Sequence, residues 1–282
     1  MAAFDRVLSG IPAFDQAVDY IRMGDNVVWR VSDLEEFRRF ADPFVEQAKK
    51  DGRNIIYFRF ADHPELVPEC PEVKRVCVPL SHRFETFTVD IHKVIEREGR
   101  DAFYVFDCLS ELQTAWATDL MMGNFFRVTC PFLFVLDTVA FFPVIRGRHS
   151  FSAITKIMNT TQLFLDVYSD PERGAMYIRP QKVWNRSSES MFLPHMYDPE
   201  KGIIQPIRDG VQTSHFYQVM DRFQRTMEVQ YVDSWDRFFN QTQVLYENGI
   251  PVDEQCGRMC NIMMTRDERL RVLVRKHFRP ED

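Results

Sequence analysis

Four candidate residues come directly after the apolar run at positions 26–31: Ser32, Asp33, Glu35 and Glu36. A strand that leads into a helix is where phosphate-binding proteins place a glycine-rich loop, a lysine and a serine or threonine. This stretch contains neither glycine nor lysine. Ser32 and Glu35 instead have the spacing of a capping box, and the carboxylates suit a helix N-terminus. The same carboxylates repel a triphosphate, since like charges about 4 Å apart cost roughly 4 kcal/mol at an effective dielectric of about 20. Two interpretations therefore stay open for this stretch: an ordinary capped surface helix, or a former anion-binding helix start that now repels polyphosphates.

A second candidate is Asp107, which ends the apolar run Phe103–Asp107 and is followed by Ser110. An apolar strand that ends in aspartate is the pattern in which many nucleotide-hydrolysing enzymes hold Mg²⁺. One carboxylate is a poor Mg²⁺ site when no phosphates share the ion. Two interpretations therefore stay open for Asp107: a retained metal ligand, or a hydrogen-bonding residue at the end of a strand.

The segment 146–150 places two arginines and a histidine around Gly147, which permits unusual backbone angles. Arg146, Arg148 and His149 can grip a phosphate or an acidic surface of a partner. The alternative is a solvated loop with structural ion pairs. Of all the candidates in the chain, this loop has the strongest functional signal.

A fourth candidate mixes aromatic and basic side chains, at Trp184 and Arg186. Such residues can stack on and grip nucleic acid, or they can anchor an interface at the edge of a sheet. We expect the second role. No sequence motif assigns a catalytic residue or a set of metal ligands, and the histidines at 63, 92 and 195 have no motif around them.

Composition narrows the class of protein. The chain has 282 residues, a formal net charge of −6 and a pI of about 5.7, which does not favour nucleic acid as a partner. No apolar run is long enough to cross a membrane, and no signal peptide is apparent. The six cysteines form no CxxC pair, which indicates reduced thiols rather than a zinc site. These features predict a soluble, cytoplasmic protein.

The elements that must position these residues alternate between strand-like and helix-like segments. We predict strands at 26–31, 54–60, 103–107, 132–137, 162–168 and 175–180, the last of which can continue past Pro180. The first four are nearly continuous apolar runs, typical of a parallel sheet buried on both faces. Helices at Asp33–Lys50 and Val89–Glu98 supply crossovers, and the turn at 169–174 predicts an antiparallel pair.

From about Ser214 the apolar spacing becomes helical and repeats at 235–245, and a capping box at Thr265–Glu268 predicts a last helix. We therefore predict an α/β domain at 1–210, with a mostly parallel sheet flanked by helices and antiparallel edge strands. A helical extension, or linker to a following domain, covers 211–282.

A family resemblance follows from these motifs. The run Ser9–Asp15 (SGIPAFD) and the segment from Arg22 to Val28 resemble the opening of KaiC/RecA-type ATPases. The run Phe103–Leu112 is similar to their Walker B strand. This resemblance implies a RecA-like P-loop fold in which Ser32–Glu36 is a degenerate Walker A loop.

A second resemblance covers nearly the whole chain. The runs at 20–31, 146–150, 161–168, 182–186 and 191–195 resemble a degenerate KaiC-like region. In some bacteria that region precedes the catalytic part of phosphoenolpyruvate (PEP) synthase/pyruvate phosphate dikinase-like proteins. The end of the chain, from Thr265 to Asp282, resembles the segment that leads into their ATP-grasp, PEP/pyruvate-binding domain. The resemblance implies a downstream or separate PEP/pyruvate-type catalytic domain as partner.

The leading hypothesis is a non-catalytic module, without cofactor, that regulates, scaffolds or oligomerises such a phosphotransferase, with a homo-oligomer among its implied assemblies. The alternative is an ATP-binding phosphotransferase or ATPase with a non-standard site. In that site Asp107 would hold Mg²⁺, and Arg146 or Arg148 would hold phosphate. The third hypothesis is a nucleic-acid-binding relative of RecA, which the acidity of the chain disfavours.

Overall fold

The computed structural model describes residues 4–60, 63–78, 83–111 and 119–232 of the chain. The chain divides into two compact units, Met1–Phe216 and Tyr217–Asp282. The first unit holds every strand described here and all the candidate residues named above. The predicted division at residue 210 stays a prediction.

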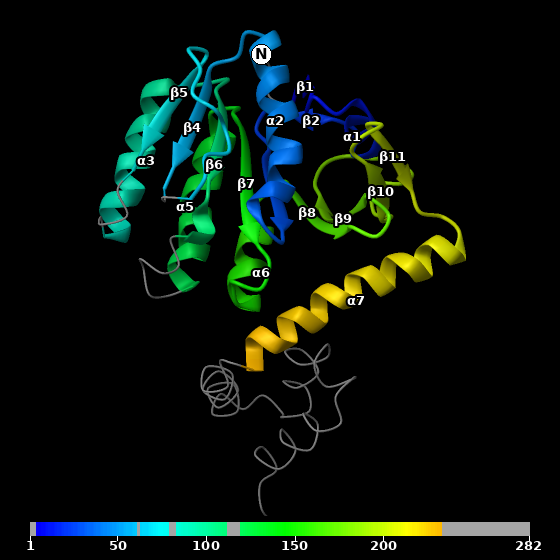
Figure 1. The fold of residues 1–282 in the computed structure, drawn as a ribbon. Helices are drawn as coiled ribbons and strands as arrows, with labels where there is room; N and C mark the ends of the chain where they lie inside the picture. The colour runs from blue at the N-terminus through cyan, green and yellow to red at the C-terminus, as the bar shows by residue number, and fades with distance from the viewer. Residues whose placement is uncertain (1–3, 61–62, 79–82, 112–118, 233–282) are drawn as a thin grey trace, which may run out of the picture. The chain divides into compact units, whose positions relative to one another are not determined.

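A nine-stranded mixed sheet organises the first unit, in the order β11-β10-β9-β8-β3-β7-β6-β4-β5 (Figure 1). Its parallel strands are β3 (Asn26–Val31), β4 (Ile55–Arg59), β5 (Val73–Cys77), β6 (Phe103–Asp107), β7 (Val139–Ile145) and β8 (Leu163–Asp170). Its antiparallel strands are β9 (Ala175–Val183), β10 (His195–Asp198) and β11 (Ile203–Pro206). The short strands β1 (Arg6–Val7) and β2 (Ile21–Arg22) pair separately. This arrangement confirms the prediction of an α/β fold with a parallel core and antiparallel edge strands.

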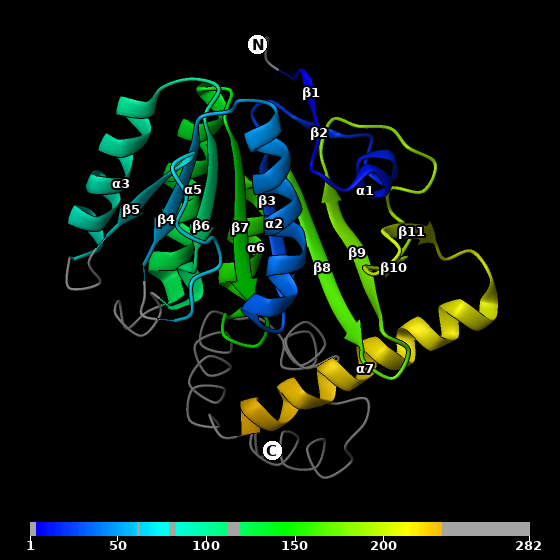
Figure 2. The same ribbon diagram turned by 45° about the horizontal axis from the view of Figure 1, so that its top comes forward.

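Helices cover both faces of the sheet. The helices α1 (Pro12–Ala17) and α2 (Leu34–Lys50) pack against one face, and α3 (Phe84–Glu98), α5 (Asp119–Val135) and α6 (Phe151–Thr160) pack against the other. In Figure 2, α2 lies in front of the sheet, and α5 and α6 lie behind it. The 3₁₀ turn η1 (Leu109–Glu111) follows β6, and α7 (Gly210–Val232) follows the last strand.

The strands are apolar on both faces because each face has its own core. In β3, Trp29 packs into the core under α1 and α2, whereas its neighbour Val28 packs into the core under α3, α5 and α6. In β6, Val105 and Phe106 divide in the same way. Successive side chains of a strand point to opposite faces, so a strand covered on both sides reads as a continuous apolar run.

One predicted strand is wrong. Residues 132–137 lie at the end of helix α5 and in the turn after it, and the strand is instead β7, Val139–Ile145. A short apolar run cannot be assigned to a buried strand or a buried helix by periodicity alone. The error also misplaced the loop at 146–150. The predicted strand ends at residue 137, some distance before Arg146, whereas in the structure Arg146 directly follows β7.

The predicted antiparallel pair is confirmed as β8 and β9, which are joined by the turn at 171–174. The strand β9 continues past Pro180, as predicted, to Val183. The register shifts between Phe164 and Leu165, and Leu165 lies opposite Pro180. A proline cannot donate to the ladder, so a bulge is one of the places where a sheet accepts it.

The predicted helix from about Ser214 corresponds to α7. Its first turns are fixed to the first unit, since His215 Nε2 lies 2.6 Å from a carboxylate oxygen of Asp170. The predicted repeat at 235–245, the capping box at Thr265–Glu268, and the cysteines 256 and 260 lie outside the described residues. The other cysteines, at 70, 77, 108 and 130, are free thiols.

Candidate functional site

The candidate residues gather at the carboxyl edge of the sheet, defined here as the residues that follow the C-terminal ends of β3, β6, β7 and β8. The chain leaves β3 through α2 on one face and leaves the adjacent β7 through α6 on the other. The connections therefore diverge between these strands, which is where open α/β sheets bind ligands. The backbone N–H of Arg146, after β7, donates to Val31 O at 2.7 Å. Two separately predicted sites thus meet at one edge.

The start of α2 is closed by its own carboxylates. The helix begins after Asp33, whose side chain accepts the backbone N–H of Glu36 at 2.9 Å. The carboxylate of Glu36 reaches back to accept the N–H of Ser32 at 2.7 Å, and its other oxygen accepts the hydroxyl of Ser169. The predicted Ser32–Glu35 capping box is therefore wrong by one residue, because Asp33 is the N-cap and Glu36 is the third helical residue.

Glu36 is buried, and burial is the main cause that raises the pKa of its carboxyl group above its usual value. Glu35, by contrast, points outward and forms an exposed ion pair with Arg38 at 3.3 Å. The N–H of Glu36 belongs to the first turn of α2, whose free N–H groups a helix start can offer to a phosphate, and the N–H of Ser32 lies one residue before the N-cap. Both are bound by carboxylate oxygens of the chain itself.

Arg146 points into the protein rather than toward solvent. Its guanidinium donates to Val167 O at 2.7 Å and to Arg30 O at 3.2 Å, and it lies 4.1 Å from the centre of the Tyr168 ring. It also lies 3.6 Å from the fully buried carboxylate of Asp166. Burial alone would raise the pKa of Asp166, but Arg30 and Arg146 together hold it below its usual value. Arg146 thus balances a buried charge.

Ser110 and His149, predicted as parts of different sites, are in contact. Ser110 Oγ lies 2.7 Å from His149 Nε2 and accepts the backbone N–H of Ile145 at 2.9 Å. Both side chains are buried. Beside them, Arg148 forms an ion pair with Glu111. The loop after β7 is therefore attached to the turn after β6 through two side-chain pairs.

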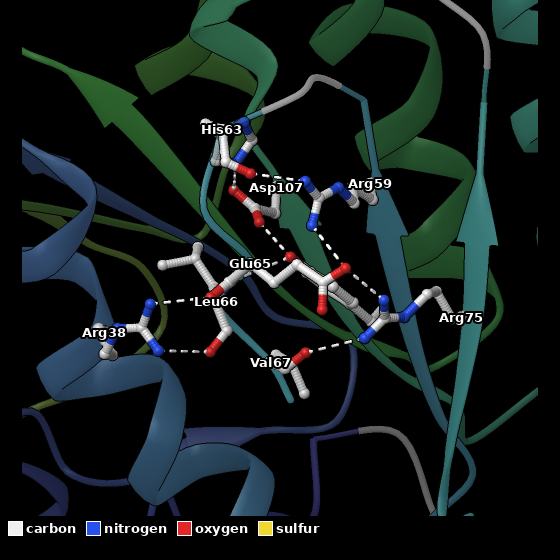
Figure 3. A network of polar contacts seen from close by, with 9 residues as sticks. Arg38, Arg59, His63, Glu65, Leu66, Val67, Arg75 and Asp107 are labelled. Carbon is white, nitrogen blue, oxygen red and sulfur yellow. Dashed lines mark hydrogen bonds and ion pairs between the residues drawn. The ribbon is translucent and has the colours of Figure 1, made fainter. Parts of the chain in front are cut away.

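Asp107 is fully buried at the end of β6, and its carboxylate is bound by one residue of β4 and one of the loop after β4 (Figure 3). One oxygen accepts the hydroxyl of Tyr57, and the other lies 2.6 Å from His63 Nε2. The Tyr57 oxygen in turn accepts the N–H of Leu66 at 3.2 Å. Burial, reinforced by the Asp107 carboxylate, raises the pKa of the Tyr57 phenol, which keeps its proton for this hydrogen bond.

Sequence reasoning missed both partners of Asp107. It left His63 without a chemical role and gave Tyr57 only as part of the predicted strand at 54–60. The link between them is the register of the folded sheet, which sets Arg59 of β4 opposite Asp107 of β6 and which no local sequence pattern shows. Residues just past β4 must therefore lie near that carboxylate.

Three arginines hold the loop that carries His63, at residues 63–67 (Figure 3). Arg38 of α2 donates to the carbonyl oxygens of residues 65 and 66, at 2.8 and 3.0 Å. Arg59 of β4 and Arg75 of β5 share the carboxylate of Glu65, and they donate to the carbonyl oxygens of residues 63 and 67. The loop is thus fixed over the end of the sheet, so His63 is held against Asp107.

The remaining predicted pair lies near the opposite, amino edge of the sheet. Arg186 is buried, forms an ion pair with Asp25 and donates to Tyr20 O at 2.8 Å. Trp184 is 43% exposed and contacts the ring of Phe134. Arg186 therefore ties the N-terminal segment to the end of β9, and only the tryptophan of this pair presents a surface.

Among the residues that the structure describes, no group of three or more histidine, cysteine or acidic side chains is arranged to hold a metal ion. Within the same residues, no helix is long and apolar enough to cross a membrane. No protein-family model matches the chain, and no curated protein sequence matches it.

Proposed function

We propose that this chain is a non-catalytic module of the RecA/KaiC class. It regulates, scaffolds or oligomerises a phosphotransferase of the PEP/pyruvate type. The first part of this proposal, that the module is non-catalytic, depends on one observation: the hydrogen bond from Ser32 N–H to the Glu36 carboxylate, at 2.7 Å. It puts a buried carboxylate where a nucleotide-binding helix start would put a phosphate.

The framework around this hydrogen bond supports the class. The first long strand, β3, is central in the sheet and leads directly into α2 at the edge where the connections diverge. P-loop proteins carry their phosphate loop between such a strand and helix. This chain has such a strand and helix, but the loop between Val31 and Leu34 is too short and too acidic to bind phosphate.

The alternative, an ATP-binding phosphotransferase, needs side chains that are already bound. Asp107 would have to release Tyr57 and His63 to take Mg²⁺. Arg146 would have to leave Asp166, a buried carboxylate, without part of its compensating charge. Asp166 would keep its ion pair with Arg30, so the cost would be smaller than the roughly 3–5 kcal/mol of an uncompensated buried charge, and nucleotide binding would have to supply it.

A titration with ATP and Mg²⁺ tests the non-catalytic half. We expect no heat of binding and no shift of the melting temperature at millimolar nucleotide. A ligand present at about 100 times its Kd stabilises a protein by roughly 2.7 kcal/mol. For a unit of this size, that corresponds to a rise of several degrees, since 1 kcal/mol moves the melting temperature by about 2–4 °C. Even micromolar affinity would therefore be seen.

The variant Asp107→Ala and the matched variant Asp90→Asn, on helix α3, complete this experiment. Saturable binding that is lost in Asp107→Ala but kept in Asp90→Asn would establish the alternative and end the proposal. A crystal with nucleotide seated against residues 32–36 would do the same.

The second part of the proposal, that the partner is a phosphotransferase of the PEP/pyruvate type, has its own test. The chain is added to a purified PEP synthase-type enzyme at ratios from equimolar to tenfold excess, and the rate of pyruvate phosphorylation is measured. We expect the rate to change saturably with the amount of chain. An unchanged rate, without co-elution of the two proteins, would remove the partner while leaving the non-catalytic half in place.

A further inference from the structure

The end of strand β8 carries a charged side chain at a place that water would normally reach. Asp170 is the last residue of β8, and the residues of the turn that follows, 171–174, are all exposed. The Asp170 side chain is nevertheless fully buried. Aspartate is almost never fully buried unless it is paired. The start of helix α7 supplies both the partner and the cover.

Two side chains of α7 reach this end of the strand. His215 Nε2 lies 2.6 Å from Asp170 Oδ2, and the side chain of His215 is 14% exposed. Phe216 is fully buried, with its ring against those of Tyr168 on β8 and Tyr177 on β9. We call His215 and Phe216 the α7 clasp.

The rest of the helix start faces water. Between Gly210 and Ser214, every residue except Thr213 is exposed, and Val211 is 81% exposed. Thr213 is half-buried, and its hydroxyl donates to the carbonyl oxygen of Asp209 in its own turn. The contact of segment 210–216 with the sheet is therefore concentrated in the α7 clasp.

The clasp buries a carboxylate that is only partly satisfied. Oδ2 of Asp170 has His215 as its partner, whereas Oδ1 has no hydrogen-bond partner among the residues that the structure describes. A buried acceptor without a partner costs free energy, which is recovered when water reaches it. Release of the clasp would expose the Phe216 ring, but it would also hydrate Asp170. Because these effects oppose each other, the clasped state is favoured by less than the burial of the ring alone would give.

The surface under the clasp adjoins the loop after β7. The Tyr168 ring contacts Phe216 and also lies 4.1 Å from the guanidinium of Arg146. Release of the clasp would therefore uncover two tyrosine rings and Asp170 beside this loop, at the edge of the sheet where the candidate residues gather. Small and polar contacts of this kind are those at which parts of one chain separate locally.

We propose that the first turns of α7 are a releasable strap over the ends of β8 and β9. The α7 clasp opens locally while the sheet stays folded, and the opening exposes Asp170 and the rings of Tyr168 and Tyr177. This inference goes beyond the proposed function, and it does not depend on the identity of a partner. It supplies the two states that a ligand or partner needs in order to regulate a protein.

Hydrogen exchange of the full 282-residue chain tests the proposal. The amide groups of residues 214–216 pair within the first turns of α7, and a helix start that leaves the sheet loses that protection because an isolated turn is unstable. The amide groups of β3, at the centre of the sheet, report unfolding of the whole sheet. We expect openings at 214–216 to be at least about 100-fold more populated than openings at β3, as for a segment that opens locally.

Variants of the clasp separate a releasable strap from a permanent attachment. His215→Ala leaves the buried Asp170 carboxylate without its partner, so openings at 214–216 should become about tenfold more frequent. The double variant Asp170→Leu with His215→Leu replaces the pair by apolar side chains, which often stabilises a buried contact, so openings should become about tenfold rarer. His92→Ala is the matched control, because His92 on α3 is also half-buried and lies 3.1 Å from the hydroxyl of Thr129. It should leave exchange at 214–216 unchanged.

Urea unfolding shows whether each variant is folded. If the double variant is not, Asp170→Asn takes its place and should also make openings rarer, because a neutral amide costs less to bury than a carboxylate. Equal opening at 214–216 and at β3 in the wild-type chain would overturn the proposal, since the helix start would then open only when the sheet unfolds. A helix start that is no better protected in the double variant than in wild type would also overturn it, as would equal effects of His215→Ala and His92→Ala.

Discussion

The carboxylate of Glu36 accepts the backbone N–H of Ser32 at 2.7 Å, so a side chain of helix α2 binds the backbone just before the helix, where the chain leaves the central strand β3. The other oxygen of Glu36 accepts the hydroxyl of Ser169, at the end of β8. One buried carboxylate therefore joins the connection after β3 to the end of β8. The proposed non-catalytic role rests on this closure of the helix start.

The first prediction separates the two candidate caps of α2. Replacing Asp33 by alanine removes the acceptor of the Glu36 N–H, and losing an N-cap costs about 1 kcal/mol. Replacing Ser32 by alanine leaves that hydrogen bond in place. Urea unfolding should therefore show a loss of about 1 kcal/mol for Asp33→Ala and a smaller loss for Ser32→Ala. The reverse order would restore Ser32 as the cap.

The second prediction compares two arginines of one loop. Arg146→Ala leaves the buried carboxylate of Asp166 with Arg30 as its charged partner and removes the donor to the carbonyl oxygens of Val167 and Arg30, so a loss of roughly 1–3 kcal/mol is expected. Arg148→Ala breaks a pair in which the arginine is 46% exposed, and such pairs contribute less than about 1 kcal/mol. Denaturant midpoints give both values. Equal losses would mean that Arg146 does not balance a buried charge.

The third prediction concerns pH. Burial raises the pKa of Asp15 to about 6, although hydrogen bonds from Ser9 act in the opposite direction. In the unfolded chain this pKa is about 3.9. The folded protein therefore binds more protons between about pH 4 and pH 6, and the contribution of Asp15 to stability is lost as the pH rises through that window. Two pKa units correspond to about 3 kcal/mol.

Asp15→Asn tests this, because it removes the titration and keeps an oxygen for the Ser9 N–H. The stability of wild type relative to the variant should fall by about 2 kcal/mol between pH 4 and pH 7, since the unfolded carboxyl is already about half ionised at pH 4. Asp25, whose pKa burial also raises to about 6, titrates in both proteins and cancels in the comparison. Parallel stability curves would show that Asp15 ionises normally in the folded state.

The fourth prediction uses two glycines with positive φ. At Gly10, with φ of +84°, an added Cβ would lie 2.1 Å from the carbonyl oxygen of Pro43 in α2. At Gly52, with φ of +62°, an added Cβ would meet nothing within 4 Å. Gly52→Ala should therefore cost only the backbone strain of about 1–2 kcal/mol, and Gly10→Ala clearly more. Thermal melts of the two variants give the order, and similar melting temperatures would contradict it.

Much of the sheet was predictable from local pattern. The runs at 26–31 and 103–107 became β3 and β6 with the predicted bounds, because a strand buried on both faces needs apolar residues at every position. The strand β7 was missed because its sequence neighbour, the end of α5, is equally apolar. Both segments lie against buried surfaces, and periodicity does not separate them.

Local sequence is enough to predict that a strand leads into an acidic helix start without glycine or lysine, since local composition governs capping and anion binding. The partners of the candidate side chains depend on the tertiary fold. His63 reaches Asp107 from the loop after the neighbouring strand β4, and Ser110 reaches His149 across 39 positions of sequence. Such contacts depend on strand order and on which loops share an edge, which are properties of the whole sheet rather than of any segment.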